Sequence, residues 1–129
     1  MTEKRWLQLA VAAACFVPLS ASILSLIRGP AWIGGVTDVP TDLDSHFRYL
    51  SGIFLAMGIG FVTCIPGIED KTGRFRLLAA MVVTGGLARL ASLLIVGAPS
   101  QGHLIGLGIE LGVVPLLTLW QARVARRTR

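Results

Sequence analysis

Charge and cysteine are both scarce in this sequence of 129 residues, and each shortage excludes a class of protein. Asp, Glu, Lys and Arg make up only 15% of the chain, which is too little for a disordered chain or a charge-rich coiled coil. Two cysteines are too few to hold together a disulfide scaffold. Apolar residues, in contrast, make up 53% of the chain and raise its mean hydropathy to +0.71. This composition indicates a small integral membrane protein rather than an ordinary soluble enzyme.

Four long apolar stretches account for most of the chain. They run over residues 6–27, 43–65, 75–96 and 103–120, and each approaches the roughly 20 residues that cross a bilayer as a helix. Their length and lack of alternation favour helices over strands. The links are short, so neighbouring helices have to run antiparallel. The sequence therefore predicts an all-α fold, a four-transmembrane-helix antiparallel bundle that forms a single membrane domain over residues 1–129.

The basic residues predict how the chain is oriented. Nine of the twelve fall in the N-terminal segment, the second link and the C-terminal tail: Lys4, Arg5, Lys71, Arg74, Arg76, Arg123, Arg126, Arg127 and Arg129. The links on the opposite side carry Arg28 alone. By the positive-inside rule, both termini face the cytoplasm. The net charge of +5 is then an orientation signal, so we expect membrane lipids as partners and no nucleic acid.

The first apolar stretch allows a competing interpretation. A basic N-terminal segment, an apolar run and Ser20-Ala21-Ser22 are also typical of a cleaved signal peptide. The apolar run continues to Ile27, however, which is long enough to span a membrane. We therefore favour a retained first helix.

Three ionisable residues inside the apolar stretches share a depth. At a rise of 1.5 Å per residue, Arg48, Arg89 and Glu110 all lie roughly 6–12 Å below the outer boundary. Asp44 precedes Arg48 by four residues, so the two can pair on one face of a helix. Because charges in a membrane face the bundle interior or a wet cavity, we expect an outward-half polar core of two charge pairs. Three further polar residues are expected at its mouth: His46, Tyr49 and His103.

Small residues and a proline accompany this expected core. Gly85 and Gly86 precede Arg89, and small residues let helices approach closely in lipid. Pro115 removes the backbone hydrogen bond to the carbonyl of Leu111, next to Glu110.

The polar residues are open to several functional interpretations. The favoured one is a binding or accessory module whose outward-half pocket holds a lipid-like, quinone-like or anionic small molecule. The alternatives are a purely structural polar core, and a small proton-coupled transporter that uses Glu110 and works as a homo-oligomer. A membrane enzyme that uses His46 or His103 is a further, weaker alternative. No nucleophile–base pair, phosphate loop or metal-ligand spacing is present, so we expect no catalytic residues, no metal and no cofactor.

Three motifs connect these residues to a known family. They are the acidic and basic segment at residues 42–52, the Gly-Gly-Leu-Ala-Arg-Leu segment at 85–90, and the run from His103 through Glu110 to Pro115. In these motifs, and over nearly its whole length, the chain resembles domain-of-unknown-function family 4345. The resemblance implies a small multi-helix membrane protein of the bacterial inner membrane and supplies no activity.

Overall fold

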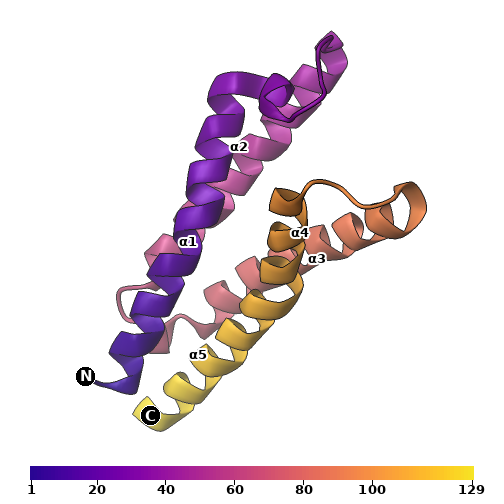
Figure 1. The fold of residues 1–129 in the computed structure, drawn as a ribbon. Helices are drawn as coiled ribbons and strands as arrows, with labels where there is room; N and C mark the ends of the chain where they lie inside the picture. The colour runs from indigo at the N-terminus through magenta and orange to yellow at the C-terminus, as the bar shows by residue number, and fades with distance from the viewer. The chain divides into compact units, whose positions relative to one another are not determined.

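The computed structural model describes all residues, 1–129, and its regular elements are all helical (Figure 1). The elements in chain order are α1 (Glu3–Arg28), η1 (Gly29–Trp32), α2 (Thr41–Cys64), η2 (Ile68–Asp70), α3 (Thr72–Val96), α4 (Gln101–Gly108), the π-helical turn η3 (Ile109–Val113) and α5 (Val114–Thr128). Because α4, η3 and α5 follow one another without a break, the chain has four long helices. The predicted all-α class is confirmed.

All four helices are long and apolar enough to cross a membrane. The candidate spans are Glu3–Trp32, Thr41–Cys64, Thr72–Val96 and Gln101–Thr128. Large apolar side chains such as Phe16, Leu94 and Leu119 lie exposed along them, as is usual for side chains that face lipid. The chain therefore has four candidate membrane-spanning helices by length and composition.

The fourth span continues well beyond the apolar stretch that predicted it. The apolar stretch ends at Trp120, but the helix runs on to Thr128. Its last turns are amphipathic: Gln121, Val124 and Ala125 are buried, and the arginines between and after them are exposed. A one-sided pattern of this kind supports a helix without raising the mean hydropathy.

The chain divides into two compact units, which are described separately. The α1–α2 unit comprises Val11–Ile65, and the α3–α5 unit comprises Met1–Ala10 with Pro66–Arg129.

In the α1–α2 unit, the two helices form an antiparallel hairpin (Figure 1). Gly58 lies against the Leu19 side chain so closely that a Cβ on Gly58 would come within 2.8 Å of Leu19 Cδ2. Cys15 and Cys64 are buried thiols that form no disulfide.

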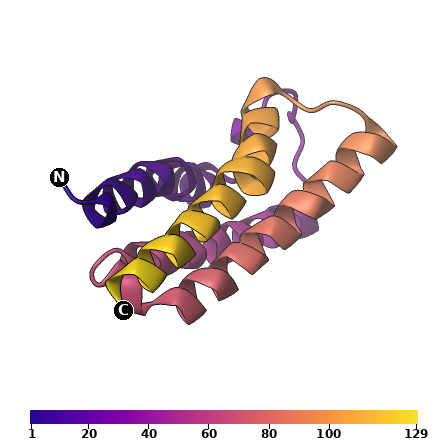
Figure 2. The same cartoon turned by 90° about the horizontal axis from the view of Figure 1, so that it is seen from below.

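In the α3–α5 unit, α3 packs against both α5 and η3, and Figure 2 shows α5 running alongside α3. Phe75 of α3 and Val124 of α5 are almost completely buried, together with Ile68 of η2 and Leu7 of the N-terminal segment. Farther along α3, Gly86 is buried against η3. A Cβ on Gly86 would lie 2.9 Å from both Glu110 Cβ and Leu111 Cδ2, so this position depends on having no side chain.

We expect Gly86→Ala to lower the thermal unfolding temperature of the detergent-solubilised protein, because the new methyl group overlaps Glu110 and Leu111. Overpacking of this kind costs about 1–3 kcal/mol. Gly85→Ala is the matched control, since nothing lies within 4 Å of a Cβ at Gly85. Equal unfolding temperatures for the two variants, measured by circular dichroism, would contradict the close approach of α3 and η3.

Candidate functional site

The most buried charged group in the middle of a span is the Glu110 carboxylate, in the α3–α5 unit. Its side chain is only 11% exposed, and it is held by Arg89 of α3 through two hydrogen bonds. Arg89 Nε lies 3.1 Å from Glu110 Oε2, and Nη2 lies 3.2 Å from Oε1. This two-point contact between a guanidinium and a carboxylate fixes the orientation of both groups as well as neutralising them.

Glu110 owes its position to an irregular turn of helix. It is the second residue of the π-turn η3, which lies directly before α5, and Pro115 occupies the first turn of α5. Pro115 has no N–H and cannot continue a regular ladder of hydrogen bonds. A π-turn inserts an extra residue into that ladder, and such turns are frequent at functional sites. The predicted break beside Glu110 therefore takes the form of a π-turn.

Arg89 keeps one side accessible. Its Nη1 makes no hydrogen bond within the protein, and its side chain is 33% exposed. A guanidinium has five N–H donors in a planar fork. The pair can therefore accept a further oxygen ligand without breaking apart.

The second charge pair lies in the α1–α2 unit. Asp44 and Arg48, four residues apart on α2, are joined by a 2.8 Å contact from Nε to Oδ1. Arg48 Nη1 also donates to the backbone carbonyl of Leu26, in the last turn of α1. Carbonyls in that turn have no partner within their own helix, and a cation is favoured there. The Arg48 side chain therefore supplies a hydrogen-bond donor to the C-terminal end of α1.

Gly29 leaves room for the Asp44–Arg48 pair beside the end of α1. It has a left-handed φ of +66°, and a Cβ placed on it would lie 2.7 Å from Arg48 Nη2 and 2.8 Å from Asp44 Oδ2. No side chain could be added there without displacing the ion pair. This contact was not predicted from the sequence, although a glycine directly after an apolar helix is a typical C-terminal signal.

The remaining predicted site residues have separate surroundings. His46 and Tyr49 are exposed on α2, and Tyr49 is 66% exposed. His103 is half-buried in the first turn of α4, where its Nδ1 lies 2.9 Å from the Oγ of Ser100. This contact holds the imidazole beside the residue that precedes α4. The structure contains no cluster of three or more His, Cys, Asp and Glu side chains that could hold a metal ion.

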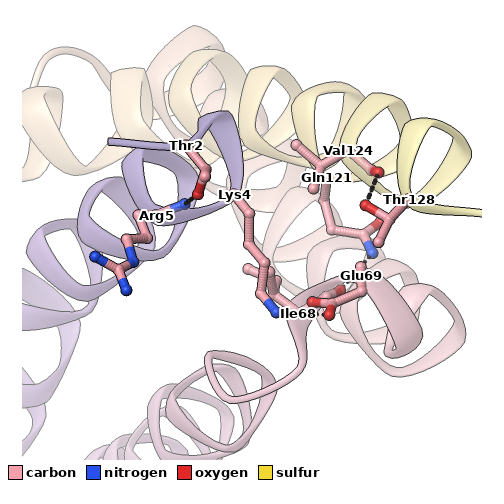
Figure 3. Close-up of polar contacts among 8 residues, drawn as sticks. All are labelled: Thr2, Lys4, Arg5, Ile68, Glu69, Gln121, Val124 and Thr128. Atoms are coloured by element: carbon pink, nitrogen blue, oxygen red, sulfur yellow. Dashed lines mark hydrogen bonds and ion pairs between the residues drawn. The ribbon is translucent and has the colours of Figure 1, made fainter.

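A third polar cluster, not predicted from the sequence, joins the N-terminal segment, η2 and α5 (Figure 3). Lys4 Nζ lies 2.6 Å from Glu69 Oε1. Gln121, which is completely buried, donates from Nε2 to the Ile68 carbonyl at 2.8 Å and to Thr72 Oγ1 at 2.9 Å. These bonds fix the start of α3 against α5.

Glu3 adds two ion pairs at the same end of this unit. Its two carboxylate oxygens contact Arg123 Nε at 3.1 Å and Arg127 Nη1 at 2.8 Å. Sequence analysis treated these arginines only as orientation signals. Their spacing of four residues places both arginines on one face of α5, but nothing in the sequence identifies Glu3 as their distant partner.

Comparison with known families gives one match. The family model described as "Domain of unknown function (DUF4345)" matches residues 6–121. No curated protein and no solved structure matches the chain.

The Lys4–Glu69 contact makes stability depend on pH. The Lys4 ammonium is the main cause that lowers the pKa of Glu69 below its ordinary value of 4.5, with a smaller effect from the backbone N–H of Glu69. A lowered pKa means that the stabilisation is complete above the ordinary value and is lost as the pH falls through the lowered one.

We therefore expect the unfolding temperature of the wild type to fall on acidification from about pH 6 to about pH 3, and to fall less in Glu69→Gln. Lys4→Gln removes the same contact and should reduce the slope similarly. Circular dichroism in detergent would measure both. Parallel pH profiles for the wild type and the two variants would rule out this contribution.

Proposed function

Because the chain belongs to the family described as "Domain of unknown function (DUF4345)", which brings no activity with it, we propose a function from the site itself. The protein is a membrane-embedded binding or accessory module. Its ligand is a lipid-like, quinone-like or anionic small molecule, and the ligand is held by an oxygen atom at the Arg89–Glu110 pair.

The observation that carries this proposal is the accessible side of Arg89. A charge pair that served only to join helices would be best placed with every donor satisfied, because unsatisfied polar groups are costly in lipid. Arg89 instead leaves Nη1 without a partner on a side chain that is one-third exposed. A quinone carbonyl, an ester or a carboxylate offers the acceptor that this nitrogen lacks.

Location is part of the same proposal. The protein lies in a bacterial inner membrane with both termini in the cytoplasm, and this is supported by nine basic residues on one side and one on the other. Glu110 and Arg89 then lie in the outward half of the membrane, where a ligand can arrive from the lipid phase. Asp44, Arg48, His46, Tyr49 and His103 are the other polar residues of that half.

We expect thermal-shift measurements on the purified protein to detect the ligand class. The probes are a short-chain ubiquinone, phosphatidylglycerol and oleate, and the expected result is a raised unfolding temperature with at least one of them. Arg89→Gln should abolish that shift. Arg28→Gln, which removes an exposed arginine outside the pair, should retain it.

A double variant separates binding from structure. Arg89→Met/Glu110→Met replaces the pair with apolar side chains of similar size, which usually preserves or raises stability. Each single replacement leaves a lone charge and should destabilise by roughly 1–3 kcal/mol. Loss of the ligand shift in a stable double variant supports binding. If the double variant kept the full shift, or if no probe shifted the wild type, the pair would be purely structural.

A second function, proton-coupled transport, is favoured by one observation. Glu110 is a single buried carboxylate on a π-turn, and π-turns and intramembrane acids are both frequent where protons or ions pass. The carboxylate would release Arg89 when it is protonated. Four helices rarely enclose a pathway alone, so this function requires a homo-oligomer.

Transport predicts a flux that depends on a proton gradient in proteoliposomes and is abolished in Glu110→Gln. Glu3→Gln is the control, since it removes a carboxylate at the membrane surface instead. The readout is the fluorescence of a pH-sensitive dye inside the vesicles. Absence of flux from a protein that remains monomeric would exclude this function and leave the binding module.

A further inference from the structure

A small hollow near the start of α3 is lined by three arginines and by no acidic residue. It has a volume of about 220 Å³. Three arginines, one threonine and two alanines line it: Thr72, Arg76, Ala122, Ala125, Arg126 and Arg129. All belong to the α3–α5 unit, and none is acidic.

The three guanidinium groups of this hollow have no acidic partner. Arg123 and Arg127 on the same α5 helix are both neutralised by Glu3. Arg76, Arg126 and Arg129 form no ion pair, and all three are exposed. The α5 arginines therefore fall into two groups, and the group that faces the hollow keeps its full positive charge.

Thr72 supplies a polar group of a different kind. Its Oγ1 accepts a hydrogen bond from the buried amide of Gln121. A hydroxyl has one proton to donate as well as lone pairs to accept. Because Gln121 Nε2 can only donate, the Thr72 proton stays available to an acceptor in the hollow.

The backbone at the start of α3 adds to the positive potential near the hollow. Thr72 is the first residue of α3, which is 25 residues long, and no side chain caps its start. The N-terminal end of a helix carries a partial positive charge that attracts anions. The hollow therefore combines three guanidinium groups, a hydroxyl donor and a helix N-terminus around one space.

From this combination we infer that the hollow binds a phosphate oxyanion, supplied by the head group of an anionic phospholipid or by free phosphate. The planar guanidinium group of one arginine matches the geometry of a phosphate and can donate two parallel hydrogen bonds to two of its oxygens. The hollow lies where the apolar stretches of α3 and α5 give way to basic residues, and basic residues at the end of a spanning helix are positioned to contact lipid head groups. This inference does not depend on the function of the Arg89–Glu110 pair.

The test uses native mass spectrometry of the full chain released from detergent micelles. We expect phosphatidylglycerol to remain bound in preference to phosphatidylcholine. Arg76→Gln/Arg126→Gln should weaken phosphatidylglycerol binding by about tenfold or more, because each direct hydrogen bond from a guanidinium to a phosphate oxygen contributes on the order of tenfold. Arg5→Gln/Arg74→Gln removes the same net charge from residues that do not line the hollow, and it should change binding by less than about threefold because only screened, indirect attraction is lost.

Inorganic phosphate, added alone, distinguishes the two sources. Binding of phosphate that is lost in Arg76→Gln/Arg126→Gln assigns the hollow to the free ion, and selective retention of the lipid assigns it to the head group. Equal losses of binding in both double variants would show that only the general surface charge attracts the anion, and this would overturn the proposed site. No preference for phosphatidylglycerol together with no phosphate binding would overturn it as well. Circular dichroism spectra of the variants should match the wild type, since the substituted side chains are exposed.

Discussion

The Arg89–Glu110 ion pair is the interaction on which the α3–α5 unit depends. A carboxylate that is almost completely buried in an apolar span is tolerated only with a counter-charge in direct contact. That contact needs α3 and η3 to approach closely, which requires a glycine at position 86. It also needs Glu110 to point toward Arg89, and the π-turn before Pro115 sets that direction. The bare backbone at Gly86, the irregular turn and the charge pair are thus one arrangement, and none of the three is easily explained without the others.

The two charge pairs look alike in the sequence, but their arginines have different hydrogen-bond partners. Arg48 donates from Nε to Asp44 and from Nη1 to the Leu26 carbonyl, so one of its hydrogen bonds satisfies a carbonyl at the end of α1. Arg89 directs two nitrogens at Glu110 alone. Each arginine leaves one terminal nitrogen without a protein partner, Nη2 of Arg48 and Nη1 of Arg89. The carboxylates differ more, because the Asp44 side chain is 38% exposed and that of Glu110 is 11% exposed. The proposed ligand contact is assigned to Arg89 because its carboxylate partner is the buried one, in the middle of a span.

The sequence predicts much of the fold because lipid imposes simple rules. Span length, the all-α class and the pairing of Asp44 with Arg48 follow from apolar run length and helical periodicity. The extension of α5 to Thr128 was missed because hydropathy does not register an amphipathic turn. The network around Gln121 and the contacts of Glu3 were missed for another reason: they join residues far apart in the chain, and periodicity carries no information on such partners. Pro115 predicted a break in the backbone hydrogen bonds beside Glu110, but the π-helical form of that break and its contact with Gly86 were not predicted.

The Glu3–Arg127 contact also has a consequence for the order of events in biogenesis. It joins residues separated by 124 positions, so the first turn of α1 emerges long before its partner has been synthesised. Until α5 has been synthesised, the Glu3 carboxylate has no arginine from that helix beside it, and α3 lacks the helix against which its buried face packs. Formation of this contact therefore has to wait until α5 has been synthesised. The α1–α2 unit, in contrast, can form its own contacts earlier, such as the hydrogen bond from Arg48 to the Leu26 carbonyl.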